Sequence, residues 1–409
     1  MYKLHKDGVV ILDFGSQYTQ LIARRIREQN VYSEILPPET TFNDILNREP
    51  AALILSGGPS SVYEKDAPDF DPHILESELP TLGICYGLHL LAQHQGGVVE
   101  STGQGEYGFA EITAENESGL LSDISSPSKV WMSHGDRVKH LPVGWQALAH
   151  SSNGVVAAMA NDDQSQVATQ FHPEVIHTAE GETILRNFLF KIAECAPNWT
   201  AGNFVQEQLK LIRKQVGDGK VLTGVSGGVD STVVGALLHK AIGERSTAVL
   251  IDHGLLRSNE ARDCVNALKI GLGVNIHSYD ESECFLSKLK GVTDPEEKRK
   301  IIGNQFIYSF DRIADELGEM EFLAQGTLYP DVIESGISKG KTAYVIKSHH
   351  NVGGLPDDMD FELIEPLREL FKDEVRNVGR ELDLPDALIE RHPFPGPGLA
   401  VRIIGEITR

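Results

Sequence analysis

Short apolar runs alternate with amphipathic stretches along the chain, and this alternation restricts the possible folds more than any other feature. Apolar runs that end in loops predict buried strands. Helical patterns separate them; residues 18–30, for example, place Leu21, Ile22 and Ile26 on one face and arginines on the other. Such alternation predicts open, mainly parallel sheets with helices on both faces. The strands are expected at 8–15, 51–58, 81–85, 129–135, 167–172, 220–228, 246–254 and 320–327, with further helices at 232–242 and 260–271.

A length of 409 residues is too great for one hydrophobic core, so more than one domain is expected. The segment 194–204 contains proline, asparagine and glycine and interrupts one helical pattern before the next begins. We therefore predict two α/β domains in tandem, at 1–198 and 199–393. The remaining stretch, 394–409, opens a new apolar run that is too short to bury its own apolar residues.

Charge and cysteine content exclude several classes of protein. A formal net charge of −22 disfavours a nucleic-acid or acidic-membrane partner. The four cysteines have spacings that fit neither a zinc site nor a dense disulfide framework, which favours a reduced, cytoplasmic protein. The first residues lack the apolar core of a signal peptide, and no apolar stretch reaches membrane-spanning length.

One cysteine lies where a nucleophile is useful. In TLGICYGLHLLA (81–92), Cys85 lies between a predicted strand and a predicted helix and is flanked by Gly83 and Gly87. A strand-to-helix turn presents its side chain at the carboxyl edge of the sheet, and the positive end of the helix favours a thiolate there. A single buried cysteine is nevertheless more often an inert packing residue.

A base and its orienting group follow a later strand. In QFHPEV (170–175), His172 ends the strand and Glu174 follows two residues later, on the same side of an extended segment. Glu174 is therefore expected to hold the His172 ring, which completes a Cys–His–carboxylate triad for acyl transfer. The amides of Tyr86 and of Gly58, in the turn LSGGPSS (55–61), are the expected oxyanion donors.

These three segments resemble the signatures of class I glutamine amidotransferases, in GICYG, LILSGGP and QFHPEV. The resemblance implies that a cysteinyl thioester forms from glutamine and releases ammonia. It implies Cys85 as nucleophile, His172 as acid and base, and Glu174 as the residue that orients His172.

A second motif carries different chemistry. Residues 221–238 read as a strand, a glycine-rich loop and a helix, with backbone amides and a helix N-terminus available to an anion. The loop lacks the Gly-Lys-Ser/Thr ending of a Walker A motif. A carboxylate beside phosphates needs a cation between them, so Asp230 predicts Mg²⁺. A capped serine–glycine turn is the alternative. The predicted ATP-binding residues are Ser226, Gly227, Gly228, Val229, Asp230, Ser231 and Thr232.

This motif resembles that of the PP-loop ATP pyrophosphatases, which adenylate a carbonyl oxygen with ATP and release pyrophosphate. Further segments resemble the glutamine-hydrolysing GMP synthetases: 12–28, 294–306, 323–335, 345–356, 365–376 and 391–402. The resemblance implies that glutamine, XMP and ATP are the substrates and that XMP is aminated through an adenyl-XMP intermediate. It also implies a homodimer for the full-length members of the family. Arg299 and Lys347 are candidate contacts for the XMP phosphate.

The sequence departs from this family at three places. His89 and Gly105 stand where the family commonly has glutamine and arginine, and 394–409 resembles only the start of a C-terminal dimerisation domain. Two alternatives therefore accompany the synthetase: an ammonia-dependent enzyme, or a nucleotide-binding module, each with an inactive glutaminase half. Another PP-loop ligase, such as NAD synthetase or a tRNA-thiolating enzyme, is disfavoured by the match at 334–354.

Overall fold

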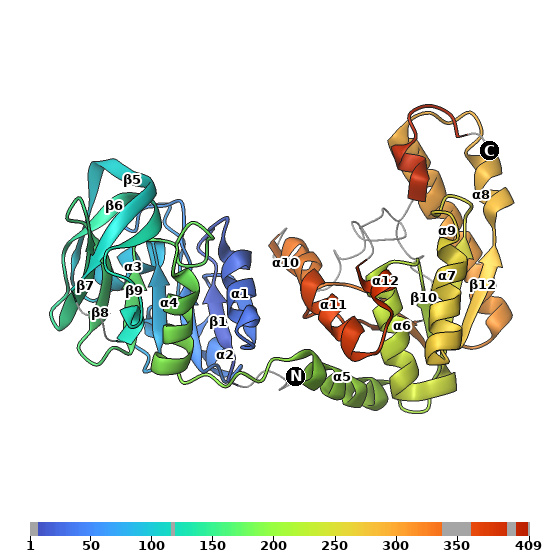
Figure 1. Ribbon diagram of the computed structural model, residues 1–409, viewed down its shortest axis with the longest axis horizontal. Coiled ribbons are helices and arrows are strands. Elements are labelled where there is room, and N and C mark those ends of the chain that lie inside the picture. Colours follow the sequence, from blue (N-terminus) through green and yellow to red (C-terminus); the bar gives the residue numbers. More distant parts are fainter. Residues whose placement is uncertain (1–6, 116–118, 338–360, 391–397, 408–409) are drawn as a thin grey trace. The chain divides into compact units, whose positions relative to one another are not determined.

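The computed structural model describes residues 7–115, 119–337, 361–390 and 398–407. It divides into two compact units, Met1–Thr200 and Ala201–Arg409 (Figure 1). Each unit contains its own sheet, so the predicted α/β class is confirmed for both.

The first unit contains a nine-stranded sheet in the order β2-β1-β3-β4-β9-β8-β7-β5-β6. The pairs from β2 to β9 are parallel. Every residue of β1, β3, β4 and β9 is buried, as expected for central strands with both faces covered. The parallel strands are β1 (Val9–Leu12), β2 (Ser33–Leu36), β3 (Ala52–Leu55), β4 (Thr81–Ile84) and β9 (Gln166–Thr169).

The other half of this sheet is antiparallel and was not predicted. Residues 129–135 were expected to form a short strand of the parallel sheet, and this was wrong. They lie within β6, at the edge of the sheet, where buried and more exposed residues alternate along a much longer strand (Figure 1). The segment 129–135 was expected to be a whole strand, but the strand continues beyond it, because the more polar residues that follow keep the same two-residue alternation. The antiparallel strands are β5 (Val98–Ala114), β6 (Ser128–His140), β7 (Trp145–Ser151) and β8 (Val156–Asn161).

Helix α3 packs directly on the parallel strands, and two glycines make this close approach possible. A Cβ added at Gly87 would lie 2.3 Å from the Leu55 carbonyl oxygen, and one at Gly83 would lie 2.6 Å from the Gly87 carbonyl. The α-helices of the unit are α1 (Thr19–Glu28), α2 (Phe42–Leu46), α3 (Tyr86–His94) and α4 (Gly181–Asn187), and the short helical turns are η1 (Pro72–Ile74), η2 (Gly119–Leu121) and η3 (Phe188–Ile192).

The second unit contains a five-stranded parallel sheet in the order β12-β11-β10-β13-β14. On one face of the sheet, Leu222 and Val249 pack against Phe285 of α8 and Phe310 of α9. Helix α6 contacts β10 and β11, and it also packs against α5 and α11. The strands are β10 (Val221–Gly224), β11 (Ser246–Asp252), β12 (Ile276–Asp280), β13 (Phe322–Ala324) and β14 (Glu362–Ile364).

Residues 398–407 belong to this unit and lie against α9. The fully buried ammonium of Lys298 donates to the carbonyls of Ile403, at 2.8 Å, and Gly405, at 2.6 Å. The α-helices are α5 (Ala201–Val216), α6 (Val229–Ile242), α7 (Glu260–Asn266), α8 (Ser282–Lys288), α9 (Pro295–Leu317), α10 (Tyr329–Ile337), α11 (Lys372–Glu381) and α12 (Asp386–Ile389), and the short turns are η4 (Gly243–Arg245), η5 (Ala267–Gly271) and η7 (Gly398–Arg402).

The contact at Gly87 predicts a stability effect. In Gly87→Ala the added methyl meets backbone atoms of β3, which cannot rotate away, so the first unit is expected to lose about 1–3 kcal/mol of stability. Thermal unfolding followed by circular dichroism measures the loss. Gly271→Ala is the matched control, because no atom lies within 4 Å of the added methyl there. Equal melting temperatures in the two variants would contradict the packing argument.

Candidate active sites

The Cys85 thiol lies at the turn between β4 and α3, and its backbone is strained. Cys85 has φ 52° and ψ −97°, a conformation that residues with a side chain rarely adopt. The turn is fixed by hydrogen bonds from the Cys85 amide to the Thr169 carbonyl, at 2.8 Å, and from the Gly87 amide to the Ser56 carbonyl, at 3.2 Å. Strain of this kind is typical of a side chain held out for chemistry at a sheet edge.

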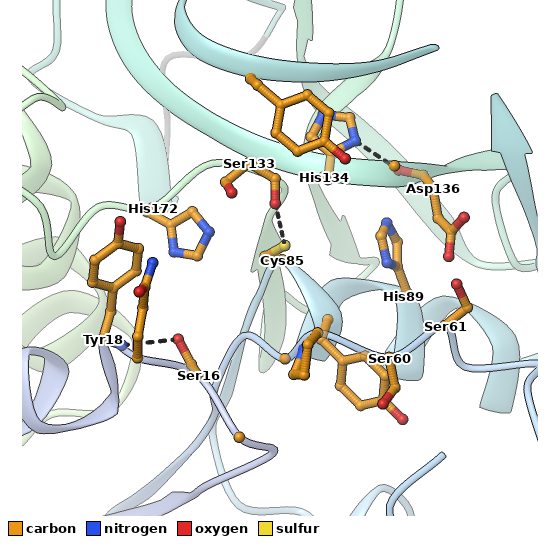
Figure 2. Close-up of a pocket in the computed structure, with 17 residues that line it drawn as sticks. Ser16, Tyr18, Ser60, Ser61, Cys85, His89, Ser133, His134, Asp136 and His172 are labelled. Atoms are coloured by element: carbon orange, nitrogen blue, oxygen red, sulfur yellow. Dashed lines mark hydrogen bonds between the residues drawn. The ribbon is translucent and has the colours of Figure 1, made fainter. Parts of the chain in front are cut away.

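His172 lies beside this thiol and is held by Glu174. Its Nδ1 is 2.7 Å from Glu174 Oε1, and both side chains are buried. In Figure 2 the His172 ring points toward Cys85. Burial alone would lower the pKa of His172, but the Glu174 charge and the Cys85 sulfur outweigh it and raise the pKa to about 10. His172 is therefore an imidazolium at neutral pH.

The glycine turn after β3 lies against the same two residues. A Cβ added at Gly57 would be 3.2 Å from His172 Cε1. One at Gly58 would be 2.7 Å from the Phe14 carbonyl oxygen and 3.3 Å from the Tyr86 ring. Tyr86 is the first residue of α3, so its amide has no acceptor within the helix. Gly58 and Tyr86, the residues of the two expected oxyanion donors, thus lie in contact with each other, and both line the same cavity as Cys85.

A cavity of about 480 Å³ opens onto the thiol, as Figure 2 shows. Most of its lining side chains are polar, and Asp136 accepts a hydrogen bond from the Tyr63 hydroxyl at 2.8 Å. A small polar molecule fits such a space. The cavity is lined by Gly15, Ser16, Gln17, Tyr18, Gly58, Pro59, Ser60, Ser61, Cys85, Tyr86, His89, Tyr107, Ser133, His134, Gly135, Asp136 and His172.

Two residues beside the thiol were missed in the sequence. The Ser133 carbonyl of β6 lies 3.7 Å from Cys85 Sγ, and the Gln170 amide nitrogen lies 3.9 Å from it. Gln170 stands within the same QFHPEV segment as His172, and that proximity was the available signal. No comparable signal in the sequence pointed to Ser133, because β6 was not expected in the antiparallel part of the sheet.

The two residues of the first unit that differ from the family pattern, His89 and Gly105, have structural consequences. His89 lines the cavity and is buried, which lowers its pKa to about 4 and keeps its imidazole neutral. Gly105 lies against β6, where an added Cβ would be 2.1 Å from the His134 carbonyl oxygen. An arginine at position 105 therefore requires a different course of the backbone at this point.

The second site lies between β10 and α6. The Ser231 hydroxyl accepts from the Ser226 amide at 3.1 Å, and the Thr232 hydroxyl donates to the Gly228 carbonyl at 2.7 Å. Gly227 has φ 78°, which favours glycine. The structure thus brings the predicted residues into one loop, which continues into the N-terminus of the 14-residue helix α6.

Asp230 has a partner that the sequence did not indicate. One of its oxygens pairs with the Lys372 ammonium of α11, while Oδ1 is buried without a hydrogen-bond partner. Gly326, in the loop after the neighbouring strand β13, approaches the same carboxylate; its added Cβ would be 3.4 Å from Asp230 Cβ. In the described ranges, no group of three or more histidine, cysteine or acidic residues forms a ready metal site.

The structure describes only one of the two candidate XMP contacts, Arg299. Arg299 is on α9, is more than half exposed, and pairs with Glu296 at 2.8 Å. Its role stays a prediction, and its neighbour Lys298 is the buried residue of this run. Lys347 lies outside the described residues.

Comparison with known proteins defines the class of each unit. Residues 10–192 match the family model of glutamine amidotransferase class-I, and residues 203–303 match that of NAD synthase. The chain therefore combines a class I amidotransferase unit with a nucleotide-dependent synthetase unit. None of the described helices combines the length and apolar character needed to cross a membrane.

Relatives that match over the whole chain identify the family. The chain is 54% identical over 405 residues to a GMP synthase [glutamine-hydrolyzing] of Dehalococcoides mccartyi (strain CBDB1), covering 99% of this chain and 76% of that protein. It is 53% identical over 403 residues to that of Lactobacillus delbrueckii subsp. bulgaricus (strain ATCC BAA-365 / Lb-18), covering 98% and 77%. It is 52% identical over 408 residues to that of Bacillus cereus (strain G9842), covering 100% and 79%. The chain belongs to the glutamine-hydrolysing GMP synthase family.

The His172 pKa predicts the effect of changing Glu174. In Glu174→Gln the charge that offsets burial is gone, so the pKa of His172 is expected to fall from about 10 and the imidazolium to be lost at neutral pH. The Cε1–H resonance of His172, followed by NMR from about pH 5 to about pH 11, measures this change. Glu182→Gln, on nearby α4, is the control. An unchanged His172 titration would show that Glu174 does not set its charge.

Proposed function

We propose that this chain is a glutamine-hydrolysing GMP synthase, a ligase that aminates XMP with ammonia taken from glutamine and drives the step with ATP. One observation carries the proposal: Cys85 and His172 line one cavity, with Glu174 paired to His172, in a chain that matches GMP synthases over 99% of its length. An active glutaminase is favoured over an inactive one by the thiol and the His172–Glu174 pair, which lie together.

In the first unit, the Cys85 thiolate attacks the side-chain carbonyl carbon of glutamine. The amides of Gly58 and Tyr86 stabilise the oxyanion that forms. His172 gives its proton to the departing nitrogen, ammonia leaves, and a thioester remains. His172 then takes a proton from water, the hydroxide attacks the thioester, and glutamate leaves as the thiolate and imidazolium are restored. Glu174 keeps the ring oriented throughout and stabilises its charged form before and after the proton is given away.

In the second unit, the loop from Ser226 to Thr232 holds the phosphates of ATP through backbone amides and hydroxyls. The 2-oxygen of XMP attacks the α-phosphorus, pyrophosphate leaves, and adenyl-XMP forms. Ammonia then attacks carbon 2 and AMP departs, leaving GMP. The oxygen–phosphorus bond to AMP replaces the bond to pyrophosphate, and the carbon–nitrogen bond then replaces the carbon–oxygen bond to AMP, with one proton lost from the nitrogen.

Mg²⁺ fits Asp230, whose Oδ1 is buried without a hydrogen-bond partner. A magnesium ion is usually held by one or two carboxylates together with phosphates and water, so a single carboxylate is sufficient here. When bound, the ion neutralises phosphate charge. Lys372 supplies a second positive charge to the same carboxylate from α11.

The division of labour is tested by one assay with two nitrogen donors. ATP, Mg²⁺ and XMP are supplied with either glutamine or ammonium, and AMP and GMP are measured. Cys85→Ala is expected to lower glutamine-driven GMP formation by at least about 10³-fold and to leave ammonium-driven formation intact. Cys195→Ala is the matched control, since burial raises the pKa of that thiol to about 11. Equal loss of both routes in Cys85→Ala would contradict the proposal.

Asp230→Asn tests the second unit. The substitution preserves the shape of the side chain but removes the charge that pairs with Lys372 and would hold Mg²⁺. Both routes are expected to fall together, by about 10²-fold or more, because ammonia from either source meets no activated XMP. Glutaminase turnover, measured as glutamate release, reports whether the first unit is still folded. Retention of GMP formation by Asp230→Asn would remove Asp230 from the ATP site.

A further inference from the structure

Two buried hydrogen-bond contacts in series, here called the relay, connect His89 through Gln170 to the Cys85 sulfur. His89 Nε2 lies 2.8 Å from Gln170 Oε1, and Gln170 Nε2 lies 3.9 Å from Cys85 Sγ. Gln170 is completely buried and His89 nearly so. In the view of Figure 2, the rings of His89 and His172 lie on the two sides of Cys85. The mechanism uses only His172.

The chemistry of the amide makes this relay directional. A carbonyl oxygen can only accept a hydrogen bond, whereas the amide nitrogen donates. If Gln170 Oε1 faces His89, the His89 Nε2 must carry a proton and the amide NH₂ group faces the sulfur. If the amide is turned, its oxygen faces the sulfur and disfavours a thiolate. The tautomer of His89 thus decides which end of the amide the nucleophile meets.

We propose that His89 is a positioning residue whose Nε2–H fixes the Gln170 amide so that its NH₂ group stabilises the Cys85 thiolate. The inference rests on the proposed role of Cys85 as nucleophile. A glutamine at position 89, the residue common in the family that this sequence resembles, also carries an NH₂ group that can donate to Gln170 Oε1. The departure at position 89 therefore preserves the relay.

Several titratable groups face these residues. His134 and Asp136 of β6 act on His89; Asp136 favours its protonation and His134 opposes it, while burial, the largest effect, keeps it neutral. His172, with Glu174 behind it, faces the thiol from the loop after β9. Because the Asp136 backbone also attracts a proton to His89, the competing state has the proton on Nδ1 and the Gln170 amide turned.

The tautomer is measured directly in the full-length chain by ¹⁵N NMR of the His89 ring at neutral pH. A protonated Nε2 is the expected result. A protonated Nδ1 would overturn the proposal, because the amide oxygen would then face the sulfur.

The effect on the thiol is measured by the pH dependence of Cys85 alkylation with iodoacetamide, followed by peptide mass spectrometry. Gln170→Glu places a carboxylate beside the sulfur, so the midpoint is expected to rise by about one unit, which is roughly a 10-fold slower reaction below the midpoint. His89→Leu removes the donor and is expected to slow the reaction about 3-fold. His89→Gln, the rescuing variant, should stay within about 2-fold of the parent.

Two controls separate the possible failures. Ammonium-driven GMP formation reports the integrity of the chain, because it does not use the thiol. If Cys85→Ala abolishes the glutamine route while Gln170→Glu and His89→Leu alkylate like the parent, the relay is wrong and the proposed function stands. If Cys85→Ala keeps the glutamine route, the proposed function fails whatever the alkylation profiles show.

Discussion

The first active site depends on the close approach of β3, β4 and α3 at one turn. Gly83 and Gly87 allow backbone atoms to meet where any side chain would collide, and the turn that results leaves Cys85 in a strained backbone conformation. Such strain costs about 1–3 kcal/mol and persists only where the surrounding structure enforces it. Here the Thr169 and Ser56 carbonyls enforce it from the two strands that flank β4. Gly58 and His172 follow from the same geometry, because they stand shortly after β3 and β9, while Tyr86 stands at the start of α3, directly after the turn at Cys85.

The sequence was most informative where local rules determine structure. The glycine spacing around Cys85, the two-residue spacing of His172 and Glu174, and the glycine-rich loop at Ser226 each depend on a turn or strand end that few residues define. It was least informative where partners are far apart. Lys372 meets Asp230 across 142 positions, and Ser133 meets Cys85 across 48, so no local pattern connects them. The antiparallel half of the sheet was missed for the same reason, because the alternation of residues within a strand does not show which other strand pairs with it.

Two of the three histidines that line the cavity, His172 and His89, differ in charge because their hydrogen-bond partners differ. Both rings are buried, and burial alone favours the neutral form of each. His172 has Glu174 at 2.7 Å and is charged, so under the proposed function it has a proton to give to the leaving nitrogen. His89 has an amide oxygen at 2.8 Å and stays neutral, so it directs a hydrogen bond without adding a second positive charge beside the first. The difference between a carboxylate and an amide as the partner is therefore sufficient to give the rings different roles.

The second site must hold anions in a chain of net charge −22. Such a chain repels nucleotide phosphates and XMP at long range, so their recognition depends on short-range groups whose local attraction outweighs the net charge. Backbone amides at the start of α6 meet this need because their dipoles are fixed by the fold. Lys372 meets it differently: in the described structure its charge is paired with Asp230, which holds the ammonium next to the loop without leaving a bare cation. Under the proposed function, Asp230 would hold Mg²⁺ and Lys372 would pair with a phosphate, so each charge would keep a partner of opposite sign.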